Sequence, residues 1–320
     1  MKSALRLINV SVIRLVILIL TWASPGKFLH AQTSVGDTLT TATSADGDYI
    51  SWREHIIDDP ELAGFLLSGS DGLVMADLDR DGYEDIVSVH ESDTAYDSAV
   101  ADPVFVPPAE GHVRIAFGSV DPDLWLNITI AEGSDAPAPE DAAIGDLNGD
   151  GFPDVIVATE LSHLIYLQNP GANARSEPWR RLILPMTQGR GSYIRVFMAD
   201  FDGDGIPEVT AANKGAQRPG PEDFARSTPV SLFKLSGDPL FGSSWREIEL
   251  GRYSVPQNAE PVDLDGDGDL DVVAGNSGQP NRYYLNDGIT APFYTITTGT
   301  RIGLWDSEFT FSIGLGDLDQ

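Results

Sequence analysis

The chain has 320 residues, of which 20 are Lys or Arg and 49 are Asp or Glu, so its formal net charge is −29. Hydrophobic residues make up 42% and charged residues 22%, which is typical of a chain that buries a core and argues against wholesale disorder. The acidic excess would repel a phosphate backbone and argues against nucleic acid as a partner, and the absence of cysteine excludes disulfides, cysteine-ligated metals and thiol catalysis.

Residues 1–31 have the order of a secretory signal peptide. Basic residues come first, the short apolar run 15–20 follows, and small residues lie at two candidate cleavage points, after Ala31, which we prefer, or after Ala23. A retained membrane anchor is the alternative, but the apolar run is far shorter than the ~20 residues that span a bilayer. We expect a secreted protein, extracellular or periplasmic, with no transmembrane segment in the mature chain.

The segment that follows, residues 32–48, is rich in Ser, Thr, Ala, Gly and Asp and predicts a flexible leader. Four of the 20 basic residues lie within the predicted signal peptide, so the mature chain would carry 16 basic residues against 49 acidic ones. Without disulfides, bound metal is the usual means of stabilising such an exported chain.

One string recurs five times in the rest of the chain. Each of the four complete copies alternates Asp or Asn with other residues, turns at Gly and runs into an apolar stretch, as in DLDRDGYEDIVSV from Asp77. The first aspartates are separated by 69, 54, 63 and 54 residues and are Asp77, Asp146, Asp200, Asp263 and Asp317. A fixed string at a nearly fixed period indicates a repeat architecture.

Stretches rich in β-branched and aromatic residues surround each copy and predict strands. An aromatic-led stretch precedes each copy, an apolar run follows it directly, and a third stretch lies further downstream. The preceding stretches are residues 52–57, 125–130, 179–184 and 245–250, and the downstream ones are residues 112–117, 164–167, 230–235 and 282–285. The runs directly after each copy are apolar on both faces, as expected of strands that are covered on both sides.

An all-β unit of three or four strands at this period must stack on its neighbours, which predicts a β-propeller over residues 49–320. Each blade would take about 60 residues, giving four complete repeats and a partial fifth. A β-sandwich is the alternative, but it does not account for a motif that recurs in phase with the strands.

The recurring string has the composition of a metal loop. It carries carboxylates at positions 1, 3, 5 and 9, a glycine at position 6 and an inward-pointing backbone carbonyl at position 7, which suits Ca²⁺ because this ion takes about 6 to 8 oxygen ligands. Mg²⁺ would need fewer protein ligands. The expected ligands are Asp77, Asp79, Asp81, Tyr83 (carbonyl) and Asp85; Asp146, Asn148, Asp150, Phe152 (carbonyl) and Asp154; Asp200, Asp202, Asp204, Ile206 (carbonyl) and Glu208; and Asp263, Asp265, Asp267, Asp269 (carbonyl) and Asp271.

Two other interpretations fit the string less well. An EF-hand shares the opening but needs Glu at position 12 and helices on both sides, whereas position 12 is occupied by Ser88, Val157, Ala211 and Ala274. Solvated turns would also be rich in Asp and Gly, but they would not recur four times in phase with strands. We therefore expect about one structural Ca²⁺ per complete repeat, four in all, with the loop of Asn148 the weakest.

The sequence resembles the FG-GAP/VCBS family of calcium-binding propeller repeats, which includes the N-terminal repeats of integrin α chains. The resemblance is carried by these strings, the apolar strands after them and the downstream YLQNPG and YYLNDG elements. The resemblance implies a secreted or cell-surface protein whose Ca²⁺ loops hold together a propeller, often seven-bladed. Glu208 departs from the usual Asp at position 9. The fifth copy breaks off after Asp317 and Asp319, which would be its first ligands, so we expect the natural chain to continue.

No catalytic motif was found. The histidines are scattered, and the tryptophans at 52, 125, 179 and 245 are interpreted as core or inter-blade packing rather than a sugar-stacking platform. The arginines at 175, 180, 181, 190 and 195 are expected to offset carboxylates.

The function we expect is therefore that of a monomeric, non-enzymatic calcium-binding module for binding or adhesion to an extracellular protein or carbohydrate. The first alternative is the propeller portion of a carbohydrate-active enzyme, of the polysaccharide lyase or sugar dehydratase type. The second alternative is a purely accessory domain of a larger secreted protein.

Overall fold

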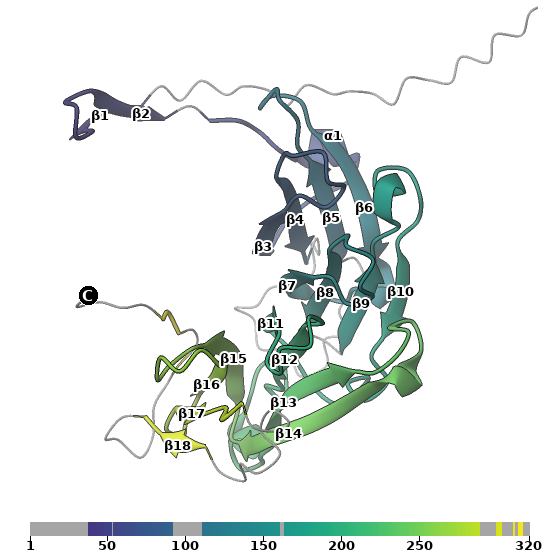
Figure 1. Cartoon of the computed structure of the whole chain (residues 1–320), viewed down its shortest axis with the longest axis vertical. Helices are drawn as coiled ribbons and strands as arrows, with labels where there is room; N and C mark the ends of the chain where they lie inside the picture. Colours follow the sequence, from purple (N-terminus) through teal and green to yellow (C-terminus); the bar gives the residue numbers. More distant parts are fainter. Residues whose placement is uncertain are drawn as a thin grey trace, which may run out of the picture.

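Four separate four-stranded antiparallel sheets follow one another along the chain (Figure 1). The computed structural model describes residues 38–52, 54–91, 111–160, 163–288, 299–302, 310 and 313–315. Each sheet is built from four strands that are consecutive in sequence, which is how a propeller blade is built. The predicted all-β fold is thus confirmed, while the seven-bladed ring and the partial fifth repeat stay predictions.

The strand bounds are as follows. The first sheet contains β3 (Ser70–Ala76), β4 (Asp85–His90), β5 (His112–Phe117) and β6 (Leu126–Glu132). The second contains β7 (Pro139–Gly145), β8 (Asp154–Thr159), β9 (Leu164–Gln168) and β10 (Arg180–Ile183). The third contains β11 (Val196–Ala199), β12 (Glu208–Ala212), β13 (Thr228–Leu235) and β14 (Trp245–Tyr253). The fourth contains β15 (Pro256–Val262), β16 (Asp271–Asn276), β17 (Arg282–Tyr284) and β18 (Thr300–Arg301).

Short elements complete the described chain. They are a hairpin of β1 (Thr38–Thr43) and β2 (Tyr49–Trp52), the helices α1 (Pro60–Ala63) and α2 (Pro221–Phe224), and the 3-10 turns Gly133–Asp135, Gly171–Asn173 and Gly242–Ser244. β1 lies within residues 32–48, where the sequence predicts a flexible leader. The predicted signal peptide lies outside the described residues. No helix in the part of the chain that the structure describes is both long and apolar enough to cross a membrane.

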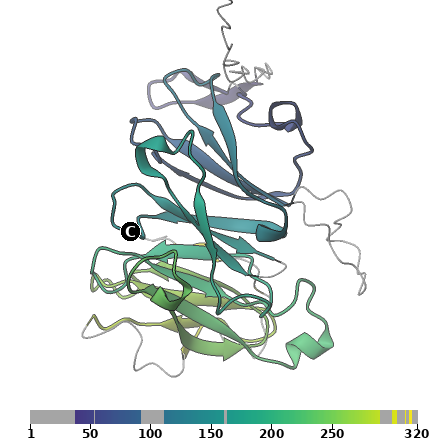
Figure 2. The same cartoon turned by 90° about the vertical axis from the view of Figure 1, so that its right-hand side faces the viewer.

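The sheets are arranged along an arc, with the first strand of each sheet on the concave side and the last strand outside (Figure 1). Figure 2, turned by 90°, shows the first sheet above the second, with the third and fourth overlapping below them. The first strands of successive sheets lie next to one another, β3 beside β7, β7 beside β11 and β11 beside β15. These first strands were missed by the sequence analysis, because polar residues such as Glu140 and Asn258 interrupt their apolar pattern.

The hydrophobic core lies between neighbouring sheets. In β8, Val155 and Val157 pack with residues of the first sheet, whereas Ile156 and Ala158 pack with residues of the third. Successive side chains of a strand point to opposite faces, so a strand between two sheets must be apolar at every position. This confirms the expectation of coverage on both sides for the runs of β8 and β12, which lie between two sheets.

One predicted strand is wrong. Residues 54–59 have no regular structure, although an aromatic-led strand was predicted over residues 52–57. The chain turns there because Asp59 caps helix α1, where its Oδ1 accepts the Leu62 amide at 2.7 Å. The Ile57 carbonyl is satisfied by the side chain of Asn127 at 2.9 Å instead of by a neighbouring strand.

Candidate metal centres

The four complete Asp strings form the loops between the first and second strands of the sheets. We call them the first to fourth acidic loops, residues 77–85, 146–154, 200–208 and 263–271, each counted through position 9, which is the first residue of the second strand. The strand register around them is the same in every sheet, because the residue before position 1 pairs with the residue at position 9. These pairs are Ala76 with Asp85, Gly145 with Asp154, Ala199 with Glu208, and Val262 with Asp271.

Each loop is folded by hydrogen bonds from its own backbone to its carboxylates. In the first loop, Asp77 accepts the amides of Asp81 at 3.0 Å and Gly82 at 2.9 Å, and Asp81 accepts the amide of Tyr83 at 2.9 Å. The other loops repeat the bonds from position 6 to position 1 and from position 7 to position 5. The spacing of the carboxylates therefore also serves to fold the turn, because it places them where they accept backbone amides of the same loop.

The carboxylates at positions 1, 3 and 9 converge. Oxygen atoms of these three side chains lie within 4.8 Å of one another in three of the four loops. The convergent groups are Asp77, Asp79 and Asp85; Asp200, Asp202 and Glu208; and Asp263, Asp265 and Asp271. The second loop has no such group because Asn148 replaces the carboxylate at position 3.

The position-9 carboxylates lie at the buried base of the loops. Asp85, Asp154 and Asp271 have no exposed surface, and Glu208 is 2% exposed. Burial raises the pKa of Asp85 to about 6 and that of Asp154 to about 7, because a charge is costly away from water. One oxygen of each is held by the amide of position 2, as in the bond from Leu78 to Asp85 at 2.8 Å.

This donor set fits a hard divalent cation. Three carboxylates aimed at one another repel unless a positive charge lies among them, and carboxylate oxygens are ligands that Ca²⁺ prefers. The part played by the carbonyls of Tyr83, Phe152, Ile206 and Asp269 stays a prediction. Asp317 and Asp319 lie outside the described residues.

In two of the loops, carboxylates form ion pairs with described Lys or Arg residues of the chain itself. Arg175, which follows the second sheet's β9, forms ion pairs with Asp79 and Asp81 of the first loop. Lys234 of β13 forms ion pairs with Asp202, Asp204 and Glu208 of the third loop. These contacts join residues far apart in sequence and were not foreseen individually.

Neighbouring loops are tied together by two buried asparagines, Asn169 and Asn286. The side-chain amide of Asn169 donates to the carbonyls of Leu78 in the first loop and Pro153 in the second, both at 2.9 Å. Asn286 likewise bridges Phe201 in the third loop at 2.8 Å and Leu270 in the fourth at 3.2 Å. They belong to the YLQNPG and YYLNDG elements, whose role as inter-sheet bridges sequence reasoning missed.

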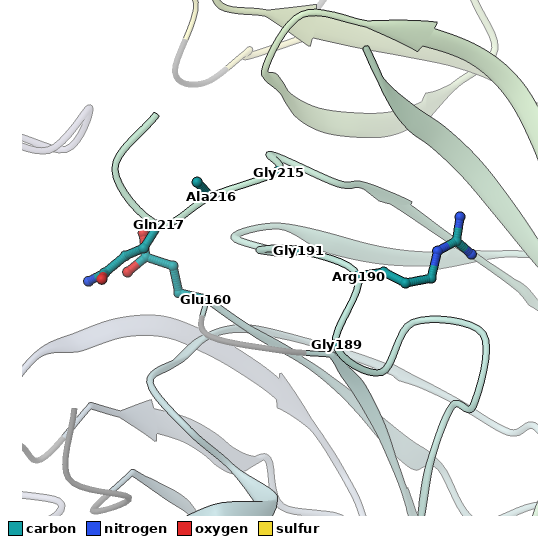
Figure 3. A pocket seen from close by; sticks show the side chains of 7 residues that line it. All are labelled: Glu160, Gly189, Arg190, Gly191, Gly215, Ala216 and Gln217. Atoms are coloured by element: carbon teal, nitrogen blue, oxygen red, sulfur yellow. The ribbon is translucent and has the colours of Figure 1, made fainter. Parts of the chain in front are cut away.

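A pocket lies at the other end of the strands, between the second and third sheets (Figure 3). Its volume is about 340 Å³, and its lining residues are Glu160, Gly189, Arg190, Gly191, Gly215, Ala216 and Gln217. Glu160 is buried and forms an ion pair with Lys214 at 2.5 Å. Figure 3 shows the Arg190 side chain directed away from Glu160 and Gln217; it pairs with Glu247.

An acidic group that the sequence analysis did not single out lies at the same end of the strands. Carboxylate oxygens of Asp71, Glu91 and Glu140 lie within 4.8 Å of one another. Burial raises the pKa of Glu140 to about 9, and the nearby carboxylates of Glu160, Asp71 and Glu91 act in the same direction. Glu140 is therefore protonated at neutral pH, which removes one charge from the group.

The remaining sequence expectations have mixed outcomes. Trp179 and Trp245 are buried in the core as expected, whereas Trp125 is only half-buried. Arg175, Arg181 and Arg190 offset carboxylates as expected, but on separate partners.

Comparison with known families identifies the repeat. Residues 146–211, which run from the second acidic loop into β12, match the model of the FG-GAP-like repeat family. The chain thus carries an FG-GAP-like repeat, and the predicted resemblance is confirmed over this segment. No curated protein matches the chain.

Three solved structures are similar to the chain at low identity. They are a rhamnogalacturonan lyase PL11 of Bacillus licheniformis (14% identity, TM-score 0.40, covering 77% of this chain and 44% of that one); the exotype rhamnogalacturonan lyase YesX (13%, 0.34, 75% and 42%); and a Trypanosoma rangeli sialidase in complex with sialic acid (12%, 0.33, 80% and 39%). The chain spans less than half the length of each.

Proposed function

We propose that this chain is an exported calcium-binding module, whose acidic loops hold Ca²⁺ and whose opposite end binds an extracellular protein or carbohydrate. The observation that carries the calcium proposal is the convergence of the carboxylates at positions 1, 3 and 9 within 4.8 Å in three loops. Bound Ca²⁺ would neutralise carboxylates that otherwise repel one another.

The loops give such an ion a structural role. Position 1 lies directly after the first strand of a sheet, and position 9 is the first residue of the second strand. A ligand set that includes both positions therefore closes the innermost hairpin of each sheet. Because the unfolded chain does not bring these oxygens together, binding would add to the stability of the folded state.

The calcium proposal is tested by counting the ions bound to metal-stripped protein in equilibrium dialysis. We expect Asp265→Ala in the fourth loop, which removes the side-chain ligand altogether, to lower the number of bound Ca²⁺ ions by one and to reduce the melting temperature in Ca²⁺ but not in chelator. Glu222→Ala is the matched control, because it also removes a carboxylate, at an exposed site outside the loops. A wild-type chain that binds no Ca²⁺ would refute the proposal.

The binding proposal is supported by the pocket between the second and third sheets. Its volume of about 340 Å³ is within the range of small-molecule sites. The Gln217 Nε2 is buried without a hydrogen-bond partner among the described residues, and glycine backbone lines the pocket beside it. Such a lining favours a polar ligand rich in hydrogen-bonding groups, such as a sugar unit, because an unpaired buried donor gains most from a new acceptor.

A glycan array probed with the calcium-loaded protein tests this second part. We expect a bound glycan whose affinity falls roughly tenfold or more in Gln217→Ala, the loss of about one buried hydrogen bond. Gln188→Ala, one residue before the pocket lining, is the control. If no glycan on the array is bound, the proposal of carbohydrate binding is contradicted. If the protein instead forms an unsaturated product that absorbs ultraviolet light, the enzymatic alternative is supported.

A further inference from the structure

The third acidic loop differs from the others at two positions that face each other. Position 9 is Glu208 rather than Asp, and the register of β12 with β13, which pairs Val209 with Phe233, brings Lys234 opposite it. The same register position in the first, second and fourth sheets is occupied by Phe117, Gln168 and Leu285. The longer acid and the lysine therefore occur together, in one sheet of the four.

The lysine ammonium lies among the carboxylates that would bind a metal. Its Nζ contacts Glu208 at 2.8 Å, Asp204 at 3.4 Å and Asp202. These are positions 9, 5 and 3 of the loop, three of its four candidate side-chain ligands. Lys234 is 23% exposed along its side chain, so the ammonium is held at the loop rather than extended into solvent.

Because Glu is longer than Asp, Glu208 can contact Lys234 and still keep the hydrogen bond to the backbone at the base of the loop. Glu208 Oε2 accepts the Phe201 amide at 2.9 Å, as the position-9 Asp does in the other loops. In those loops the second oxygen accepts another backbone amide, from Gly118, Asn169 or Asn286. In the third loop the second oxygen, Oε1, faces Lys234 instead.

The other loops lack this arrangement. Arg175 reaches positions 3 and 5 of the first loop and forms no ion pair with Asp85, and it comes from a different sheet. Within the described part of the chain, no Lys or Arg pairs with Asp263, Asp265, Asp267 or Asp271 of the fourth loop. The fourth loop is therefore the matched comparison for the third.

We propose that the ammonium group of Lys234 takes the place of the calcium ion in the third loop, so that this loop closes without metal and the calcium sites of the proposed function are those of the other loops. A divalent ion at the same carboxylates would have to displace a hydrogen-bonded ammonium and accept a positive charge beside it. The expected difference in calcium binding between the third and fourth loops rests on the proposed function. The role of Lys234 in closing the third loop does not.

Calcium counts in variants separate the third loop from the fourth. We expect Asp202→Ala to leave the number of bound Ca²⁺ ions unchanged, whereas Asp265→Ala lowers it by one. Lys234→Met should raise the count by one, and the double variant Asp202→Ala, Lys234→Met should lose that extra ion. Lys234→Arg, which keeps the charge, should match the wild type. A count lowered by Asp202→Ala and unaffected by Lys234→Met would overturn the proposal.

Melting in chelator tests the lysine even if no loop binds calcium. We expect Lys234→Met to melt several degrees below the wild type in EDTA, and the deficit to shrink when Asp202→Asn is added, because the uncompensated carboxylate is then gone. If Lys234→Met and the wild type melt together in EDTA, the lysine does not hold the loop. If instead EDTA melting behaves as expected but no Ca²⁺ is bound by any variant, the calcium proposal alone fails.

Discussion

Two residues in each acidic loop have a left-handed backbone, which glycine adopts at least cost. The torsion angles are φ +92°, +89°, +87° and +99° for Gly82, Gly151, Gly205 and Gly268 at position 6, and φ +62°, +71°, +70° and +78° for Arg80, Gly149, Gly203 and Gly266 at position 4. An L-residue with a Cβ is strained in this region. The need for a left-handed residue at position 6 can be predicted from the string, because all four complete copies have Gly there. The same need at position 4 is less evident, because the first copy has Arg80 there.

Gly149→Ala tests the strain at position 4. A Cβ there meets no atom within 4 Å, so any cost comes from the backbone conformation rather than from a clash. We expect a loss of about 1 kcal/mol in the free energy of unfolding, measured with urea, and a smaller loss for Gly149→Asn, because Asn tolerates this region better. Equal stability of the alanine variant and the wild type would contradict the argument.

Glu140 gives the stability of the molecule a pH dependence. Its pKa rises from the usual 4.5 to about 9 in the folded chain, chiefly because of burial. The folded state thus binds a proton that the unfolded state releases above pH 4.5, so stability is lost as pH rises from there toward pH 9. This sign is opposite to that of a carboxylate stabilised by an ion pair.

In Glu140→Gln we expect the fall in the free energy of unfolding between pH 5 and pH 9 to be shallower than in the wild type. The difference in slope should approach about 1.4 kcal/mol per pH unit, the value for one proton. Urea unfolding at several pH values, in chelator, provides the measurement, with the exposed Glu222→Gln as control. Parallel pH profiles would show that Glu140 does not titrate in this way.

At the scale of the elements, the turn after the third strand couples neighbouring sheets. Asn169 follows β9; its backbone amide binds Asp154 at 2.8 Å, and its side chain bridges the first two acidic loops. Gly171 donates to its side-chain oxygen at 2.9 Å. A single buried side chain thus satisfies groups from two loops and its own turn, which explains the N-x-G pattern in both downstream elements.

Asn169→Ala should destabilise the chain by about 2–3 kcal/mol, because it leaves the buried carbonyls of Leu78 and Pro153 with an unmet hydrogen bond. The control is Asn173→Ala, which removes an exposed bond to Glu177 and should change stability by less than about 0.5 kcal/mol. Urea unfolding of both variants makes the comparison. Similar losses in the two would mean that the bridge between sheets is not important.

At the scale of the whole molecule, packing and charge act on different parts. Apolar clusters between consecutive sheets supply the core, while the acidic loops all join the first strand of a sheet to the second. With a formal charge of −29, the chain repels itself most where these loops gather carboxylates. We therefore expect cations, whether bound or free, to stabilise the assembly of sheets.

In metal-stripped protein we expect the melting temperature to rise by roughly 2–4 °C when NaCl is raised from about 0.01 M to about 0.5 M, because the Debye length falls steeply over this range. Calcium-loaded protein should respond less, since its loop charges are already neutralised. Differential scanning calorimetry of the two forms measures the effect, and an equal response would contradict it.

The sequence by itself determined the repeat, its phase, the four acidic loops and the strands that follow them. These features are local. Asp side chains bind the amides of their own loop, and glycines allow its left-handed turns. The apolar composition of each Val- and Ile-rich run by itself predicts that the strand is buried. The tertiary structure decided the innermost strands and the cations that meet the loops. Lys234 lies 26 residues from Glu208, Asn169 lies 91 from Leu78 and Arg175 lies 96 from Asp79, and contacts at such separations depend on how the sheets stack.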